Sequence, residues 1–287
     1  MTGNQADHRL FVFHAADLNW PCVPEWADER CSPRRFHNIL AADQLKVAYP
    51  FSPRLWQIYD PVARIGVQLT GSQADLPPWD FGAPLRQHLH WLLLQHGLRL
   101  THAATLGRNG RGVLLVGGGG AGKSGTTLAG LSAGMATCGD DYVAIGLKAE
   151  PAAGLVFRIL KQDPSGLARH VEMSAKTNRL AANWQGKFEL DPEEFFPGCL
   201  AEHMAIDAVM LPSITGREQA HIIPVSRGES MRALMRSNLY QYPGEDDDGF
   251  RFFARLLERL PCYRIDLALD PRVNGEAIDR FLLMARR

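Results

Sequence analysis

The sequence predicts an α/β protein with a core built on a mixed central sheet and a smaller β-rich module at the N-terminus. Three observations support this fold class. An apolar, strand-like run over 113–116 leads into a glycine-rich stretch and then into a helical pattern over 124–131. Short alternating patterns typical of strands precede residue 71. Helical patterns over 250–260 and 275–286 flank a late strand pattern over 263–269.

Composition limits the classes of partner. The chain has 287 residues, with 31 Lys and Arg against 31 Asp and Glu, so its charge indicates neither a nucleic acid nor a membrane partner. Five scattered cysteines without a C-x-x-C pair predict neither a zinc ribbon nor a disulfide framework. The polar N-terminus lacks a signal core, and no segment reaches the ~18–20 apolar residues of a membrane span. We therefore expect a cytoplasmic protein.

The N-terminal module is expected over 1–97. Its strand patterns lie at 9–14, 44–49, 55–59 and 63–70, and a helix is predicted over 85–97. His88, His90 and His96 lie on that helix, but their spacing puts the first two on different faces. Solvated or locally hydrogen-bonded histidines are therefore favoured over a metal site, and the module carries no motif that names its chemistry.

The core domain is expected over 98–287 and begins with a strand pattern at 98–104 and a polar turn at 108–110. The next segment matches G-x-x-x-x-G-K-[ST], which predicts a P-loop core because a strand precedes it and a helix follows it. Its backbone amides would hold the phosphates of ATP, Lys123 would reach the β- and γ-phosphates, and the Ser124 hydroxyl would bind Mg²⁺. The alternative is a plain glycine-rich turn. The expected cofactor-binding residues are Gly117, Gly118, Gly119, Gly120, Ala121, Gly122, Lys123, Ser124 and Gly125.

Two adjacent carboxylates, Asp140 and Asp141, stand directly before the apolar strand pattern at 142–145. Phosphoryl transfer needs a carboxylate for the metal and a group that takes the proton of the acceptor hydroxyl. Mutual repulsion and partial burial are expected to raise one of the two pKa values towards that of a useful base. An aspartate-rich turn that merely opens a strand is the alternative.

The stretch from Thr101 to Ile145 resembles the catalytic core of the HPr kinase/phosphorylase family, in which a strand ending in histidine precedes the P-loop and an aspartate pair follows it. By position, the resemblance implies that Asp141 is the catalytic base and that Asp140 supports the metal with Ser124. It implies that His102 lines the phosphate site and that Lys123 stabilises the transferring group. It also implies a homo-oligomer, because the related enzymes form oligomers.

A weaker match lies downstream. The segment I-P-V-S-R-G at 223–228 resembles a family segment that precedes a C-terminal helix, here expected over 230–238. Arg232 and Arg236 share a face of that helix and could counter phosphate charge, as could Arg227 before it, or they could form a surface stripe. Lys176 and Lys187 lie in the middle segment that varies within the family, and either could contact an acceptor or a phosphate or could be a surface lysine. The glutamate-and-arginine signature of the bifunctional enzymes is not visible.

The chain instead resembles shorter HPr-kinase-related proteins of peptide-modification systems, including kinases of a lasso-peptide precursor serine. The expected function is an ATP- and Mg²⁺-dependent kinase that acts on a serine or other hydroxyl of a peptide or small protein. Two alternatives stay open: a kinase for a free amino acid or sugar on the same core, and a nucleotide-binding regulator without catalysis. The intact set of Lys123, Ser124, Asp140 and Asp141 argues against the regulator, because a pure binder needs no base.

Overall fold

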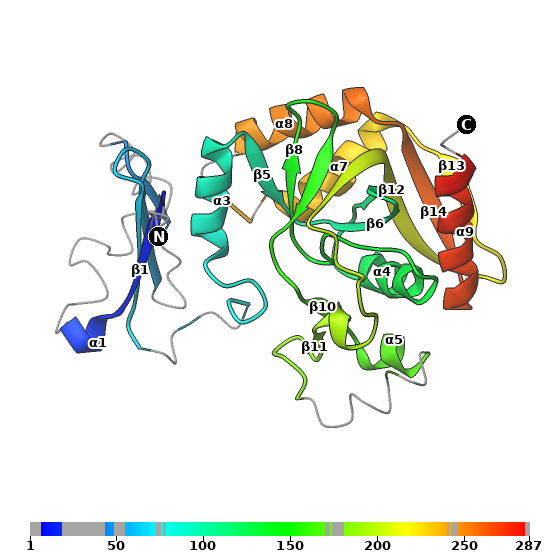
Figure 1. The fold of residues 1–287 in the computed structure, drawn as a ribbon, viewed down its shortest axis with the longest axis horizontal. Helices are drawn as coiled ribbons and strands as arrows, with labels where there is room; N and C mark the ends of the chain where they lie inside the picture. Colours follow the sequence, from blue (N-terminus) through cyan, green and yellow to red (C-terminus); the bar gives the residue numbers. More distant parts are fainter. Residues whose placement is uncertain are drawn as a thin grey trace, which may run out of the picture. The chain divides into compact units, whose positions relative to one another are not determined.

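The computed structural model describes residues 7–18, 44–48, 55–72, 76, 79–169, 173, 181–239, 241–242 and 246–284. It divides the chain into two compact units (Figure 1). The first comprises residues 1–96 with 242–244, and the second comprises residues 97–241 with 245–287. Among the described helices, none is long and apolar enough to cross a bilayer.

The first unit contains a four-stranded sheet in the order β1 (Arg9–His14), β4 (Ile65–Thr70), β3 (Leu55–Asp60) and β2 (Lys46–Ala48). β1 runs parallel to β4 and the other pairs are antiparallel. A short helix, α1 (Ala15–Leu18), follows β1. Burial alternates along β3 and β4, because successive side chains in a strand point to opposite faces.

Helix α3 (Arg86–Gln95) packs against β3, where Trp91 stacks on Tyr59 with ring centroids 6.3 Å apart. Of the two expected alternatives, solvated or locally hydrogen-bonded histidines, His88 follows the second, and neither His88 nor His90 is solvated. His88 is buried and its Nε2 lies 3.0 Å from the carbonyl oxygen of Val67, as a local hydrogen bond. His90 is buried and stacks on Tyr242 at 3.6 Å between ring centroids.

The second unit is built on an eight-stranded mixed sheet, which confirms the prediction of an α/β fold with a mixed central sheet. Its longest strand, β12 (His203–Arg217), runs parallel to β7 (Arg111–Leu115) on one side and to β14 (Cys262–Ala268) on the other. The remaining strands are β5 (Leu98–Thr101), β6 (Ala104–Arg108), β8 (Val143–Gly146), β9 (Ala152–Leu155) and β13 (His221–Pro224). The expected single strand over 98–104 is in fact two strands, β5 and β6, separated at His102 and Ala103.

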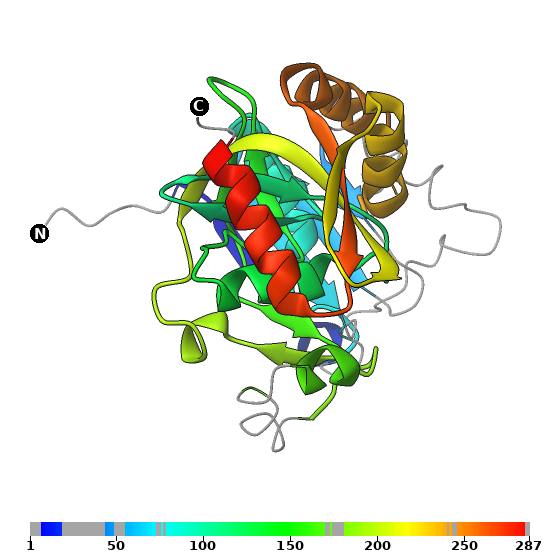
Figure 2. The ribbon, with the colours of Figure 1, turned by 90° about the vertical axis from the view of Figure 1, so that its right-hand side faces the viewer.

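Helices cover both faces of this sheet (Figures 1 and 2). On one face, α4 (Lys123–Ser132) packs against α9 (Pro271–Met284), and their apolar residues join one hydrophobic core. On the other, α7 (Arg227–Asn238) packs against α8 (Asp246–Arg259), and residues such as Leu234 and Phe253 form a second core. The large sheet therefore lies between two hydrophobic cores.

A small antiparallel pair, β10 (Leu160–Gln162) and β11 (Phe188–Leu190), lies outside the large sheet. Helix α5 (Pro164–Ala168) follows β10 directly, and its first turn is capped by the Asp163 carboxylate, which accepts a hydrogen bond from the Gly166 amide at 2.6 Å. A single 3₁₀ turn, η2 (Pro192–Glu194), follows β11. This pair carries Lys161 to the site described next.

Candidate active site

The glycine-rich loop joins the end of β7 to the start of α4. Gly120 and Gly122 have φ values of 78° and 98°, a region that favours glycine. A Cβ on Gly122 would also lie 2.7 Å from Leu267 Cδ1. No side chain caps α4, so amide groups of its first turn remain free of a capping partner. A loop of this form at a helix N-terminus suits an anion such as phosphate.

Lys123 is the first residue of α4 and folds back over this loop. Its Nζ donates a hydrogen bond to the carbonyl oxygen of Gly117 at 2.7 Å, and the side chain is buried. Burial lowers the pKa of Lys123, while the nearby carboxylates of Asp140 and Asp141 oppose that shift. The ammonium group therefore lies inside the loop, where an incoming phosphate would meet it.

Asp140 lies between α4 and β8 in the chain and is 3% exposed. Its Oδ2 accepts a hydrogen bond from the Lys161 amide at 3.0 Å, and its Oδ1 has no partner at hydrogen-bond distance among the described residues. Burial raises the pKa of Asp140, and the charge of Asp141 adds to the rise. The hydroxyls of Ser124 and Thr127 offset part of it. The predicted neighbours Ser124 and Asp140 are thus brought together.

Asp141 is held at both carboxylate oxygens. His102 Nε2 lies 3.0 Å from Oδ1, and Lys161 Nζ lies 2.9 Å from Oδ2. Burial alone would raise the pKa of Asp141, but the hydrogen bond and charge of His102, together with Lys161, hold it well below its usual value. The expected rise in one pKa of the pair therefore falls on Asp140, not on the residue predicted to be the base.

His102 is positioned by the end of α7. Its backbone amide donates to Asn238 Oδ1 at 2.7 Å, and its Nδ1 lies 3.1 Å from the Ser237 carbonyl oxygen. A carbonyl only accepts, so this contact assigns a proton to Nδ1. Nε2 faces Asp141 Oδ1 at 3.0 Å. This contact is a hydrogen bond when a proton lies between the two atoms, because neither a bare ring nitrogen nor an ionised carboxylate can donate.

Lys161 is the site residue that the sequence did not reveal. Its side chain is largely buried, and it contacts Asp141 at 2.9 Å and Glu189 at 3.9 Å. The only signal was one lysine between Leu160 and Gln162 in a short apolar segment, which does not distinguish a site lysine from a surface one. Lys187 lines the same cavity, whereas Lys176 lies outside the described residues.

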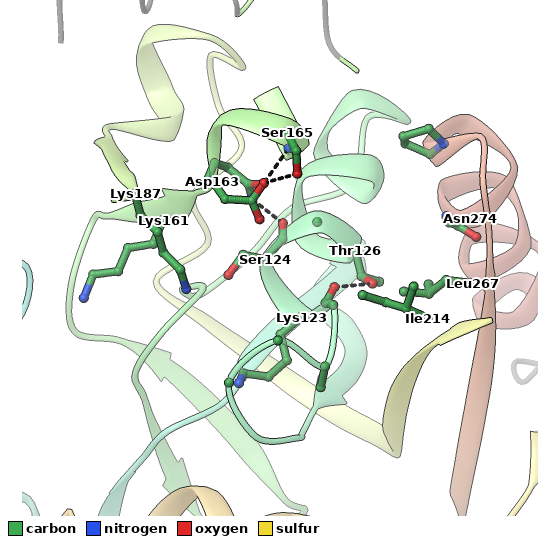
Figure 3. A pocket seen from close by; sticks show the side chains of 18 of the residues that line it. Lys123, Ser124, Thr126, Lys161, Asp163, Ser165, Lys187, Ile214, Leu267 and Asn274 are labelled. Carbon is green, nitrogen blue, oxygen red and sulfur yellow. Dashed lines mark hydrogen bonds between the residues drawn. The ribbon is translucent and has the colours of Figure 1, made fainter. Parts of the chain in front are cut away.

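One cavity of about 320 Å³ connects these groups (Figure 3). At one end lie His102, Asp141 and Lys161, and in the middle lies the loop from Gly118 to Ser124. The other end is largely apolar and is lined by residues including Ile214, Leu267 and Leu269. In Figure 3, Lys161 and Lys187 lie on one side of the start of α4, and Ile214 and Leu267 lie on the other.

The α7 arginines occupy a different place. Arg232 and Arg236 line a second cavity, which borders the loop residues Gly117 to Ala121. They therefore approach the loop without joining His102 and Asp141. Arg227 lies elsewhere, because its guanidinium donates to the Glu258 carbonyl oxygen at 3.1 Å.

No protein-family model matches the sequence, and no curated protein matches it. Among solved structures, the Hpr(Ser) kinase/phosphatase from Coxiella burnetii aligns with a TM-score of 0.37 and 11% identity, over 66% of this chain and 98% of that chain.

Proposed function

We propose that this protein is an ATP- and Mg²⁺-dependent kinase that phosphorylates a serine or another hydroxyl of a peptide or small protein. The observation that carries the proposal is that the Asp141 carboxylate lines the same cavity as the glycine-rich loop and the first turn of α4. Phosphoryl transfer needs a phosphate cradle and a proton acceptor at one place, and a protein that only binds nucleotide needs no such carboxylate.

The glycine-rich loop and Lys123 would form the phosphate-binding site. Free amides at the start of α4 and along the loop would donate to phosphate oxygens. Lys123 Nζ, now bonded to the Gly117 carbonyl oxygen at 2.7 Å, would exchange that contact for a phosphate oxygen. Its positive charge would stabilise the charge that develops on the transferring group.

Asp140 and Ser124 fit a magnesium ion. Oxygen ligands are those that Mg²⁺ prefers, and Asp140 Oδ1 is a buried carboxylate oxygen without a partner among the described residues. The described residues form no cluster of three or more His, Cys, Asp or Glu that would hold a metal ion by themselves. This fits Mg²⁺, which uses one or two carboxylates and completes its shell with phosphates and water. When bound, the ion would neutralise phosphate charge.

Asp141 would act on the acceptor. As the acceptor oxygen bonds to the γ-phosphorus, the bond from that phosphorus to the leaving oxygen breaks and the hydroxyl proton passes to the Asp141 carboxylate. The lowered pKa of Asp141, caused by His102 and Lys161 despite burial, keeps the carboxylate ionised at neutral pH. His102 and Lys161 orient it.

The direct test is phosphoryl transfer from ATP labelled at the γ-position. The full chain would be incubated with Mg²⁺ and, separately, with a library of serine-containing peptides and with pools of amino acids and sugars. Label in peptides, confined to hydroxyl residues, would support the proposal. Label only in small molecules would overturn the peptide acceptor, and nucleotide binding without any transfer would overturn the kinase assignment.

A further inference from the structure

We infer that the apolar end of the cavity, formed by Ile214, Leu267 and Leu269, holds the nucleobase of the phosphoryl donor and accepts adenine and guanine with similar affinity. The inference rests on the proposed function and specifies its donor site. It concerns an end of the cavity that takes no part in the chemistry assigned to Asp141.

The first argument is the order of groups along the cavity. The charged end carries His102, Asp141 and Lys161, and the loop lies between that end and the apolar end. If the loop holds the phosphates, the γ-phosphate must face the carboxylate that serves the acceptor. The nucleoside must then extend the opposite way, past Thr126 towards Ile214 and Leu267, which lie together beside the start of α4 in Figure 3.

The second argument is the position of the strand ends. β7, β12 and β14 run parallel, so their carboxyl ends meet at one edge of the sheet, where ligands bind in open α/β sheets. Ile214 and Leu267 are register partners in the β12–β14 pair. A Cβ placed on Gly122 would lie 2.7 Å from Leu267 and 3.4 Å from Ile214, so both side chains lie directly against the loop.

The third argument is exposed apolar surface. Ile214 is 70% exposed and Leu269 is 61% exposed, although both line a cavity. Flat purine rings gain free energy when their faces cover such side chains. A base next to the phosphate cradle is therefore the occupant that the neighbouring loop favours.

The expected weak selectivity between adenine and guanine follows from the polar side chains at this end of the cavity, which are already hydrogen-bonded within the protein. Thr126 Oγ1 already donates to the Gly122 carbonyl oxygen at 2.8 Å. The Asn274 amide is bonded to Ala268, whose amide donates to Oδ1 at 2.7 Å and whose carbonyl accepts from Nδ2 at 3.0 Å. Strong discrimination needs polar groups committed to the edge of the base, and an apolar pocket discriminates poorly.

The test compares three ligands by calorimetric titration of the full chain in Mg²⁺: tripolyphosphate, ATP and GTP. The variants are Ile214→Ser and Leu269→Ser, and the control is Leu283→Ser, an apolar position on α9 that is 50% exposed and lies outside the cavity. We expect each cavity variant to weaken the affinity for ATP and GTP by about threefold to tenfold. The affinity for tripolyphosphate should stay unchanged, because only contacts to the base are lost. The control should change none of the three.

In the unmodified protein, the affinities for ATP and GTP should differ by less than about tenfold. The inference is overturned if ATP binds no tighter than tripolyphosphate, or if Ile214→Ser weakens the binding of tripolyphosphate as much as that of ATP. It is also overturned if the protein prefers one of the two purine nucleotides by more than about tenfold. Failure of the folded protein to bind either tripolyphosphate or ATP would instead overturn the proposed function, and the inference with it. Thermal melting of each variant confirms that the fold is kept.

Discussion

His102 Nε2 lies 3.0 Å from Asp141 Oδ1, while His102 Nδ1 lies 3.1 Å from the Ser237 carbonyl oxygen. The histidine thus links the carboxylate before β8 to the end of α7, which is 135 residues away along the chain from His102. Because the carbonyl can only accept, the ring is fixed in one orientation with Nε2 directed at Asp141. Lys161 fixes the second carboxylate oxygen at 2.9 Å.

Asp141→Asn should abolish most of the phosphoryl transfer and leave nucleotide binding nearly unchanged. The amide keeps the shape of the side chain but cannot take the hydroxyl proton, so we expect kcat to fall by about 10²–10⁴-fold. Steady-state transfer assays and titration with ATP measure the two effects. Asp248→Asn, at an exposed position on α8, is the matched control and should leave both unaltered. Substantial phosphoryl transfer by the Asp141→Asn variant would contradict the assignment of Asp141 as the catalytic base.

His102→Gln should move the acid limb of the kcat/KM profile to higher pH. In the unmodified protein His102 and Lys161 outweigh burial and lower the pKa of Asp141, so the carboxylate is protonated only below its ordinary range. Removing the histidine removes a major cause of that lowering, and the pKa of Asp141 must rise. Rates measured from pH 4 to pH 8 at saturating and limiting substrate test this. An acid limb at the same pH in both proteins would contradict the linkage.

Lys123→Ala should impair both nucleotide affinity and turnover. The change removes the ammonium group from the loop, and the loss of one donor to a developing negative charge costs about 10²–10³-fold in kcat. Lys148→Ala, at an exposed position after β8, removes the same charge away from the loop. If both variants bound ATP and turned over as the unmodified protein does, the loop would not be the phosphate site.

Gly275→Ala should destabilise the second unit. A methyl group there would lie 2.5 Å from the Ala129 carbonyl oxygen, so α9 and α4 would have to separate. Such overpacking costs about 1–3 kcal/mol in the free energy of unfolding. Gly228→Ala in α7 is the matched control, because the nearest atom to its methyl group is Ser226 Oγ at 3.9 Å. That variant should be unchanged or more stable by up to about 1 kcal/mol, as urea unfolding would show.

Stability should fall at alkaline pH through Cys138. Burial raises the pKa of this thiol from its usual value of 9.0 to about 11. The unfolded chain therefore loses the proton first as pH rises, and the free energy of unfolding decreases by up to about 1.4 kcal/mol per pH unit across that window. Cys138→Ala should unfold with a shallower pH dependence between pH 9 and pH 11. Identical slopes for the two proteins in urea unfolding would contradict the prediction.

The sequence was a good guide to elements whose signals are local. The glycine-rich loop, the helix that follows it and the Asp140–Asp141 turn before β8 all lie where the motif and the periodicity predict. The strand β12 was not located because its core contacts come from β7 and β14, each far away along the chain. The single predicted strand over 98–104 divides into β5 and β6 because each pairs with a different strand, β8 or β7.

The sequence by itself determined that this chain carries a glycine-rich loop between a strand and a helix, with an aspartate pair at a fixed offset, since both depend on residues close together in the chain. Only the tertiary structure decided that Lys161 reaches Asp141, that the end of α7 orients His102, and that Ile214 and Leu267 border the loop. It also decided that burial raises the pKa of Asp140 while two partners lower that of Asp141. Neighbouring residues of identical type differ in this way because a pKa reports the surrounding charges and solvent, which only folding assembles.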